Sequence, residues 1–235
     1  MDKIENVIRA IQEDTRSIYW GQIYTSTIAG SKWLHDKAIS PGRWAVGYEY
    51  LYVLYRTLTE SNPSSILELG LGQSTKLTAQ YASYKGIPHL IIEHDKQWTE
   101  YFLTSWPNLS KNTIVQLLPL QKRGDKKNPY FAYQNFRKIA NKKDGWSLIL
   151  IDGPFGGDGN LSRRDVLEQL PSILSKDFVI MIDDCGRPGE TNTANEAMLT
   201  LQENNILYKC GLYDGGGIKK TCVIASPKWK WLTSL

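Results

Sequence analysis

The sequence contains few residues of the kinds that build metal sites and disulfide frameworks. Its 235 residues include only three cysteines and three histidines. These residues are Cys185, Cys210, Cys222, His35, His89 and His94. No two of the cysteines have Cys-x-x-Cys spacing, and no two of the histidines have His-x-x-x-His spacing. The sequence therefore argues against a zinc site or a set of disulfides, and we expect the thiols to be reduced and buried.

Long apolar runs are also missing. No run approaches the roughly 20 residues that a helix needs to cross a bilayer. The first 17 residues, MDKIENVIRAIQEDTRS, form a charged amphipathic pattern without the apolar core of a secretory signal. We expect a cytoplasmic protein with no transmembrane segment.

Neither sign of charge is in large excess, but the basic residues are unevenly placed. The formal net charge is +4. Basic residues concentrate between positions 121 and 145, at Lys122, Arg123, Lys126, Lys127, Arg137, Lys138, Lys142 and Lys143. Such a segment is either a solvated surface or a docking patch for phosphate, on nucleic acid or on a phosphorylated carrier.

Residues 1–62 have the pattern of a helical extension. Apolar residues at three-and-four spacing predict an amphipathic helix over residues 3–17. They are Ile4, Val7, Ile8 and Ile11. A second helix is expected to begin after Pro41-Gly42 and to end before Asn62-Pro63, since an apolar and aromatic stripe runs through residues 44–58.

From residue 63 onward, short apolar runs alternate with helix-length segments. The expected strands are Ile66–Leu69, His89–Glu93, Thr113–Leu118, Ser147–Asp152, Phe178–Asp183, Leu207–Leu212 and Thr221–Ala225. The expected helices are Ser74–Lys85, Gln97–Leu103, Tyr130–Asn141, Arg163–Leu174 and Thr193–Glu203. Runs such as LILID and VIMID are apolar up to a final acid, which suits parallel strands buried on both faces. The alternation predicts a doubly wound α/β domain over residues 63–235, preceded by the helical extension.

A glycine turn follows the first expected strand, in SILELGLGQSTKL. Gly70 and Gly72 allow backbone amides to approach a ligand closely, and the next helix begins near Ser74. The third glycine of a dinucleotide-binding Gly-x-Gly-x-x-Gly is missing, because Thr75 takes its place. Glu68, just before the turn, would repel a pyrophosphate and favour a cation.

These features indicate S-adenosylmethionine, which carries an ammonium group and a sulfonium and no phosphate. We predict that it contacts Glu68, Gly70, Gly72 and Ser74. The alternative is that Glu68 is only salt-bridged and that the glycines form an ordinary strand-to-helix turn.

The second expected strand, HLIIE, ends in another acid. Glu93 follows the glycine turn by about twenty residues, where an acid can accept hydrogen bonds from ribose hydroxyls. Asp95 is the competing candidate. Since an acid at a strand tip points into the crevice more reliably than one that starts the next helix, we predict Glu93 as the ribose contact.

Four motifs occur in the order ELGLGQS, IIEHD, LILIDGP and VIMIDD. With this order and spacing, the chain from about residue 62 onward resembles the class I S-adenosylmethionine-dependent methyltransferases. IIEHD and LILIDGP are similar to the group that includes plant glucuronoxylan 4-O-methyltransferases. PGRWAVGYEYLY resembles bacterial methyltransferases of surface-glycan gene clusters.

The resemblance implies a Rossmann-like sheet of seven strands, in the order 3-2-1-4-5-7-6, whose last strand is antiparallel. It places Glu68 and Gly70 at the methionine part of the cofactor, Glu93 at the ribose, and the loop after the third strand at the adenine. That loop reads LLPLQKR, without the Asp or Asn that often holds the adenine amine. Backbone groups around Leu118–Leu120, or Gln121, would have to replace it.

Acids also end the fourth and fifth expected strands. Asp152 follows LILI, and Asp183 and Asp184 follow VIMI. Methyl transfer to a hydroxyl needs the acceptor oxygen in line with the methyl group, and a group that removes the proton of that hydroxyl. We predict these three aspartates as catalytic, and Asp152 also as a contact of the cofactor.

The aspartates could act in two ways. One of them could be the general base, with a pKa raised by its negative neighbours. Alternatively they could bind Mg²⁺ or Mn²⁺, which would lower the pKa of the hydroxyl. Catechol-type O-methyltransferases, which the pattern partly resembles, use acids at similar strand tips for magnesium. We make no prediction of which residues would bind the metal. As a third possibility, the aspartates only cap the turns that follow them.

Three further residues are predicted to contact the acceptor. Arg163 and Arg187 could bind a carboxylate or a phosphate, or could pair with acids such as Asp165 and Glu190. Trp44 lies in a less regular aromatic stretch, where a ring can stack on a sugar or cover the cofactor.

The sequence therefore predicts a methyltransferase that methylates a hydroxyl of a carbohydrate or glycan precursor. Methylation of RNA or of a small metabolite is the alternative, and nucleic acid is the less favoured acceptor. No Asn-Pro-Pro-Tyr motif of amine methylation follows the fourth strand, where DGPF stands instead. A non-catalytic assembly protein that only binds the cofactor is a different class of function.

Overall fold

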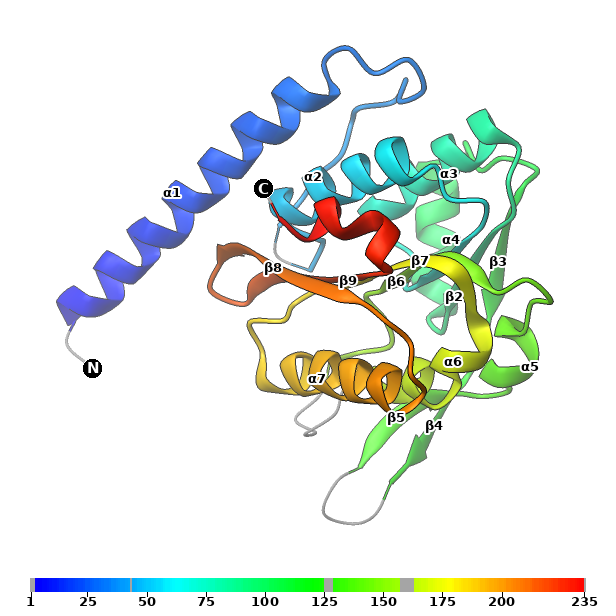
Figure 1. The fold of residues 1–235 in the computed structure, drawn as a ribbon. Coiled ribbons are helices and arrows are strands. Elements are labelled where there is room, and N and C mark those ends of the chain that lie inside the picture. The colour runs from blue at the N-terminus through cyan, green and yellow to red at the C-terminus, as the bar shows by residue number, and fades with distance from the viewer. Residues whose placement is uncertain (1–2, 43, 125–128, 157–162, 235) are drawn as a thin grey trace.

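The computed structural model describes residues 3–42, 44–124, 129–156 and 163–234. Its centre is a seven-stranded sheet with helices on both faces (Figure 1). The strands are β1 (Ile66–Leu69), β2 (His89–Glu93), β3 (Thr113–Leu117), β6 (Trp146–Ile151), β7 (Leu174–Ile182), β8 (Lys209–Gly216) and β9 (Lys219–Ala225). Their order is β3-β2-β1-β6-β7-β9-β8. β9 is antiparallel to β7 and β8, and the other neighbours pair in parallel. The predicted strand order, with its antiparallel last strand, is confirmed.

Helices and shorter helical segments connect these strands. The α-helices are α1 (Lys3–Ile28), α2 (Tyr48–Arg56), α3 (Gln73–Lys85), α4 (Lys96–Ser105), α5 (Phe136–Ala140), α6 (Leu170–Ile173) and α7 (Pro188–Glu203). A π-helical turn covers Thr57–Ser61, and 3₁₀ segments cover Arg164–Gln169 and Pro227–Thr233.

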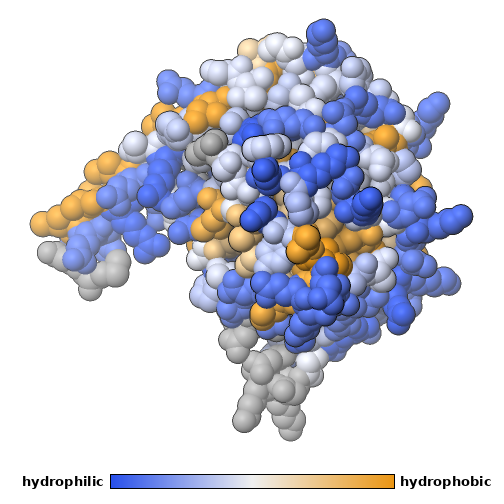
Figure 2. Space-filling model, viewed as in Figure 1, coloured by the Kyte–Doolittle hydropathy of each residue, from blue (hydrophilic) through white to orange (hydrophobic). Residues whose placement is uncertain are grey.

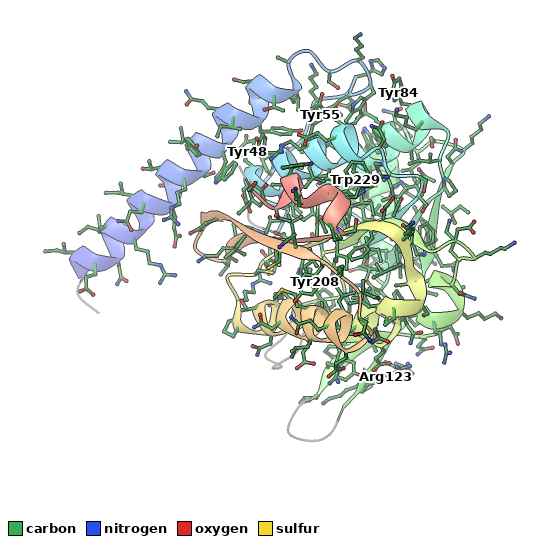
Figure 3. All side chains as sticks on the ribbon, viewed as in Figure 1. Tyr48, Tyr55, Tyr84, Arg123, Tyr208 and Trp229 are labelled. Carbon is green, nitrogen blue, oxygen red and sulfur yellow. The ribbon has the colours of Figure 1, made fainter. Side chains whose placement is uncertain are left out.

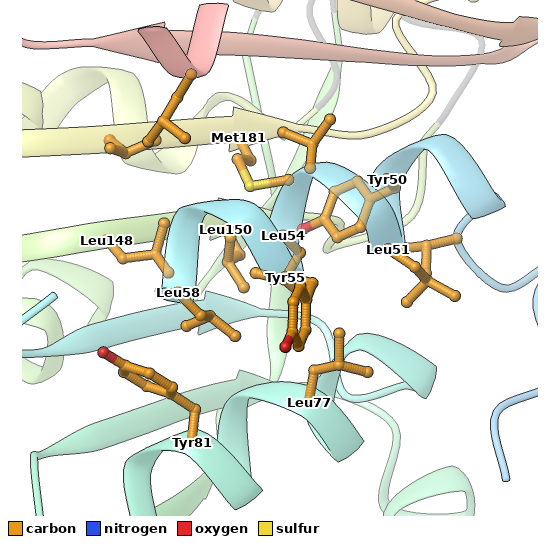
Figure 4. Close-up of a cluster of buried hydrophobic side chains, with 14 of the residues drawn as sticks. Tyr50, Leu51, Leu54, Tyr55, Leu58, Leu77, Tyr81, Leu148, Leu150 and Met181 are labelled. Atoms are coloured by element: carbon orange, nitrogen blue, oxygen red, sulfur yellow. The ribbon is translucent and has the colours of Figure 1, made fainter. Parts of the chain in front are cut away.

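β6 shows why the sheet has helices on both faces. Leu148 and Leu150 pack into one core with residues of α2 and α3 (Figure 4). Ile149 and Ile151 point to the opposite face and pack with residues of α6 and α7. Because alternate side chains enter two separate cores, the strand is apolar from Leu148 to Ile151. The first position free to be polar is Asp152, just past the end of the strand.

α2 begins later than expected. The sequence predicts its start after Pro41-Gly42, whereas the helix starts at Tyr48. Gly42 has a φ of 94°, which turns the chain away from a helical path, and Trp44 lies in the irregular segment that follows. The predicted end is confirmed, because the helical chain stops at Asn62 in a left-handed conformation. α2 packs into the core of the sheet, and a domain boundary at residue 62 stays a prediction.

α1 extends away from the body of the molecule (Figure 1). It has 26 residues and is longer than the predicted helix over 3–17. Its buried residues, Trp20, Tyr24 and Ile28, all lie in its C-terminal half. None of the helices in the described ranges is long and apolar enough to cross a membrane.

A hairpin of β4 (Leu120–Arg123) and β5 (Tyr130–Tyr133) stands outside the main sheet. The sequence predicts a helix over Tyr130–Asn141, and this prediction is wrong for its first half. Phe131 and Tyr133 each gain a cross-strand partner in β4, which suits aromatic residues better than a short exposed helix would. The helix begins only at α5.

The basic segment is divided between this hairpin and α5. Its described basic residues are Lys122, Arg123, Arg137, Lys138, Lys142 and Lys143. Lys126 and Lys127 lie outside the described residues. Arg123, labelled in Figure 3, lies 3.5 Å from Glu168, so part of the positive charge is already paired.

Candidate active site

The carboxyl ends of β6 and β7 bring three aspartates together. The strands pair in parallel with Ile151 opposite Ile182, so the residues that follow, Asp152 and Asp183, emerge side by side. Asp184 comes next and has a left-handed φ of 57°. One carboxylate oxygen from each aspartate lies within 4.8 Å of the others. The three residues predicted as catalytic therefore share one small region.

Two cations lie among these aspartates. Arg163 Nη2 is 3.1 Å from Asp152 Oδ1 and 3.4 Å from Asp184 Oδ2. Lys219 Nζ, at the start of β9, is 2.8 Å from Asp184 Oδ1 and 3.6 Å from Asp183 Oδ2. The Arg163 side chain is only 4% exposed. It was predicted to meet an acceptor, whereas its guanidinium lies against acids of the chain itself.

Arg187, the second predicted acceptor contact, is partly exposed to solvent. Its side chain is 31% exposed, and Nη1 lies 3.1 Å from Asp184 Oδ2 and 3.6 Å from Glu190 Oε1. Glu190, in the first turn of α7, is buried and also lies 3.9 Å from Arg163 Nε. Of the two arginines, Arg187 is thus the one whose side chain can still reach a ligand.

Sequence reasoning missed Glu49, which comes to this region from α2. It lies in the first turn of the helix and is buried. Gly47 and Gly215 make room for it, since a Cβ at Gly215 would lie within 2.3 Å of Glu49 Oε2. Asp183 and Lys219 are among its electrostatic neighbours. The available signal was an acid inside the otherwise apolar and aromatic run VGYEYLYVLY.

This acidic cluster holds more negative than positive groups. Its acids are Glu49, Asp152, Asp183, Asp184 and Glu190, and its bases are Arg163, Arg187 and Lys219. Burial raises the pKa of Asp152 despite Arg163, and burial together with Asp184 raises the pKa of Asp183. Burial and the charge of Asp183 raise the pKa of Glu49 to about 8. The cluster can therefore take up and release protons near neutral pH.

The glycine turn after β1 lies directly beside Asp152. Gly70 has a φ of 98°, and a Cβ there would come within 3.2 Å of the Asp152 backbone carbonyl. A Cβ at Gly153 would lie 2.5 Å from the Tyr133 hydroxyl. Gly72 is different, because a Cβ there would meet nothing within 4 Å. Gly70 is thus required by backbone packing, and Gly72 faces open space.

Glu68 points away from that open space. Its carboxylate accepts hydrogen bonds from the hydroxyls of Ser74, Thr75 and Thr78 at 2.7, 3.0 and 2.7 Å. His89 Nε2 lies 3.0 Å from the same carboxylate. These partners match the roughly four acceptor positions of a carboxylate. Glu68 and Ser74 were expected to contact a ligand, whereas here they fasten the start of α3 to β1 in the interior.

Glu93 ends β2 beside the glycine turn. Its Oε2 accepts a hydrogen bond from the Leu71 amide at 2.9 Å, and its Oε1 accepts bonds from the amides of His94 and Asp95 at 2.6 and 2.9 Å. Burial opposes ionisation, but the His94 side chain and these amides lower the pKa of Glu93. Glu93 is therefore an ionised carboxylate at physiological pH.

The remaining predicted contacts lie outside the acidic cluster. Trp44 is 96% exposed in the segment before α2. Leu118 is buried, and its amide donates to the Glu93 carbonyl at 2.8 Å. Gln121 belongs to the β4 strand of the hairpin. Contacts of Trp44 with an acceptor, and of the Leu118–Gln121 region with adenine, stay predictions.

Comparison with known proteins supports the fold assignment. No protein-family profile and no curated protein matches the sequence. Among solved structures, the O-methyltransferase from Bacillus cereus in complex with S-adenosylhomocysteine has a TM-score of 0.50 and 14% identity, covering 94% of this chain and 97% of that chain.

Two other solved structures show the same likeness. The S-adenosylhomocysteine-bound methyltransferase PaMTH1 from Podospora anserina has a TM-score of 0.50 and 14% identity, covering 87% of this chain and 86% of that one. A precorrin-6y methyltransferase from Geobacter metallireducens has a TM-score of 0.51 and 12% identity, covering 81% and 94%. At such identities the likeness establishes only that this chain shares the fold of these methyltransferases.

Proposed function

We propose that this chain is an S-adenosylmethionine-dependent O-methyltransferase with its site at the carboxyl ends of β1, β2, β6 and β7. The observation that carries the proposal is that an ionised acid, Glu93, and a proton-accepting acid, Asp152, lie at the same edge of one sheet. Glu93 Oε2 accepts one hydrogen bond, from the Leu71 amide, and offers its second acceptor position to a ribose hydroxyl. Asp152 suits the proton of an acceptor hydroxyl. The fold shared with methyltransferases supports this interpretation.

The glycine turn and Glu93 fit the cofactor. Gly72 faces open space, and Glu93 keeps its negative charge beside it. When bound, S-adenosylmethionine would supply a methyl group activated by a positively charged sulfur. The ionised carboxylate of Glu93 would favour a cationic ligand over a pyrophosphate. In this arrangement Glu68 and Ser74 would act indirectly, because they hold the turn in position.

Asp152 is our candidate for the general base. Its side chain is 24% exposed, whereas those of Asp183 and Asp184 are 1% and 6% exposed. Of the three aspartates, Asp152 is therefore the one that can meet an acceptor. Its raised pKa makes it a better proton acceptor than an ordinary aspartate. The hydroxyl proton would pass to Asp152, which leaves the acceptor oxygen as the nucleophile.

A divalent cation does not fit the acidic cluster as it stands. The donor set alone is suitable, because three carboxylates converge and hard cations prefer oxygen ligands. However, Arg163 already lies between Asp152 and Asp184, and Lys219 lies against Asp183 and Asp184. The side chains of the chain thus supply positive charge where Mg²⁺ or Mn²⁺ would bind, and we derive no step that uses a metal.

A carbohydrate or glycan precursor is the acceptor that we propose. The exposed side of Arg187 could bind a carboxylate or phosphate of such a molecule, and the exposed indole of Trp44 could stack on a sugar ring. The basic residues of the hairpin and α5 keep RNA as the alternative acceptor, with a small non-sugar metabolite as a further one. A non-catalytic protein that only binds the cofactor would bind it without transferring its methyl group.

Calorimetry followed by a transfer assay tests these possibilities in order. We expect the full chain to bind S-adenosylmethionine and S-adenosylhomocysteine, and binding of neither would refute the proposed function. Incubation with cofactor carrying a labelled methyl group, and a panel of nucleotide sugars, oligosaccharides and RNA, then identifies the acceptor. Label on RNA alone would replace the glycan proposal, and binding without label on any acceptor would favour the non-catalytic class.

A further inference from the structure

α1 has two apolar sides, and its own chain covers only one. Trp20, Tyr24 and Ile28 recur every four residues and pack against the body of the molecule. Trp20 Nε1 donates to the Asp214 carbonyl at 2.9 Å, and the Tyr24 ring lies 6.0 Å from that of Tyr48. This side holds the C-terminal half of the helix in place.

The second apolar side faces solvent. Ile4, Ile8, Ile11 and Ile18 are 65%, 49%, 59% and 68% exposed. Their spacing of four, three and seven residues places them along one line of the helix, which we call the isoleucine stripe. Figure 2 shows orange, apolar residues along the outer edge of this helix. At about 100° per residue, Trp20 lies roughly 160° around the helix from Ile18.

Two polar residues of the same helix, Glu13 and Arg16, face the chain itself. Arg16 Nη1 lies 2.5 Å from Asp214 Oδ2 in β8. A Cβ at Gly216 would come within 3.1 Å of the Glu13 Cα, so the helix backbone passes close to the β8–β9 turn. The isoleucine stripe therefore points away from the body, and no described part of the chain can cover it while Trp20 stays packed.

We propose that the isoleucine stripe pairs with α1 of a second copy of this chain. Apolar residues that alternate three and four apart are the pattern of paired helices. Both copies carry the same stripe, so one face serves both partners of a two-fold dimer. Six large apolar side chains, with Val7 and Tyr19 beside the stripe, expose on the order of 600 Å² per copy, near the roughly 800 Å² of a standard interface.

The charges on α1 favour a helix over a membrane as the partner. From Lys3 to Ile28 the basic residues are Lys3, Arg9 and Arg16, and the acidic ones are Glu5, Glu13 and Asp14. The helix is thus neutral, whereas helices that lie on anionic membranes carry a basic polar face. Arg9 and Arg16 are also already paired, with Glu13 at 3.0 Å and with Asp214.

Sedimentation velocity of the full chain tests this pairing. We expect the native protein to be a dimer at micromolar concentration. Ile11→Glu should raise the dimer dissociation constant at least about tenfold, because it buries a charge in the apolar interface. Ser17→Glu is the matched control, since it adds the same charge at an exposed position on another side of α1. It should leave the dissociation constant unchanged.

Circular dichroism must show that both variants keep native helix content, and Ile4→Glu serves as the second variant if Ile11→Glu does not fold. A native protein that stays monomeric up to about 100 µM would overturn the proposal. So would a dimer that both stripe variants leave intact. Binding of the native monomer to phosphatidylcholine–phosphatidylserine vesicles, lost in Ile11→Glu, would replace the second copy by a membrane. The pairing does not depend on the proposed activity, so either can fail alone.

Discussion

The guanidinium of Arg163 lies 3.1 Å from the carboxylate of Asp152 at the tip of β6. Arg163 begins the segment that leads to the 3₁₀ turn before α6, has a φ of 59°, and has almost no solvent exposure. An acid that ends a buried strand is thus neutralised by a cation from the chain that follows. The pair thus lies at the proposed active site and also contributes to the stability of the fold.

Replacement of Arg163 by Met should destabilise the fold. The change leaves Asp152 without its cation, whereas Asp184 keeps Arg187 and Lys219. Loss of one partner of a buried ion pair costs about 3–5 kcal/mol. Urea unfolding at pH 7 measures the difference in the free energy of unfolding. Arg164→Met is the control, because Arg164 only lies over the Tyr130 ring at 5.6 Å, and its loss should cost less than about 1 kcal/mol. Equal stabilities of the two variants would contradict the role of Arg163.

Glu49→Gln should change how stability depends on pH. The folded state raises the pKa of Glu49 to about 8 from its ordinary 4.5, so between these values the folded protein holds a proton that the unfolded chain releases. Stability from this group is therefore present below about pH 4.5 and is lost as the pH rises toward 8. Glutamine keeps the shape of the side chain and cannot ionise, so the variant should lose less stability between pH 5 and pH 8 than the native protein.

Urea unfolding at pH 5, 6.5 and 8 measures this dependence. We expect the variant to gain on the order of 1–3 kcal/mol over the native protein at pH 8 relative to pH 5. Glu196→Gln, at an exposed position of α7, is the control and should leave the dependence as it is in the native protein. Parallel stability curves for native protein and Glu49→Gln would show that Glu49 titrates as an ordinary carboxylate.

The strand order was predicted from the resemblance to a known family, and the meeting of the three aspartates followed from that order and from the pattern of the strands. β6 and β7 are apolar over the four residues before their final acid, so their ends can be recognised in LILID and VIMID. Adjacent parallel strands then place those acids together. The position of Asp152 beside Asp183 follows from the order of the strands alone.

Other parts of the site depend on packing that no local pattern encodes. Glu49 reaches the acidic cluster because of how α2 crosses the sheet, and Arg163 because of how the chain after Asp152 returns. The face of the sheet to which Glu68 points could have been predicted from the sequence. Leu67 and Leu69 enter the core on one face of the sheet, so the alternation of β1 turns Glu68 to the other face, where it meets residues of α3.

The β4–β5 hairpin was missed because its sequence fits two periods. Tyr130, Tyr133 and Phe136 recur every three residues, which fits one side of a helix, whereas Phe131 and Tyr133 alternate, which fits a strand. The strand gains its stability from pairing with β4, which lies earlier in the chain. The structure of this segment depends on its pairing with another part of the chain. A local stretch of sequence carries no information about that pairing.

Glu68→Gln and Glu93→Gln should separate a positioning residue from a contacting one. Glu68→Gln replaces an oxygen acceptor by a donor among Ser74, Thr75, Thr78 and His89, so we expect a loss of about 1–3 kcal/mol in the free energy of unfolding. Glu93→Gln should in addition weaken binding of S-adenosylhomocysteine at least about tenfold. Its carboxylate accepts bonds from three backbone amides, so a similar loss of stability should accompany this change.

Calorimetry at low temperature, where both variants stay folded, compares their affinities. Glu100→Gln, at an exposed position of α4, is the control for both. If Glu68→Gln weakens cofactor binding as much as Glu93→Gln while remaining as stable as the native protein, then Glu68 contacts the ligand directly and the positioning role is wrong.

Asp152→Asn should remove methyl transfer while leaving the cofactor site usable. The amide cannot accept the hydroxyl proton, and loss of a general base lowers kcat by about 10²–10⁴-fold. Because Arg163 retains Asp184 as a partner, we expect the variant to fold. Asparagine keeps one acceptor oxygen for the predicted contact with the cofactor, so S-adenosylhomocysteine should bind within about threefold of the native affinity. Single-turnover assays with labelled cofactor, with and without EDTA, measure the rate of methyl transfer and its dependence on a metal once an acceptor is known.

Two outcomes would contradict this role of Asp152. Native activity that falls in EDTA and returns with Mg²⁺ would show that a metal displaces Arg163 and Lys219. Full activity in Asp152→Asn would assign the base elsewhere.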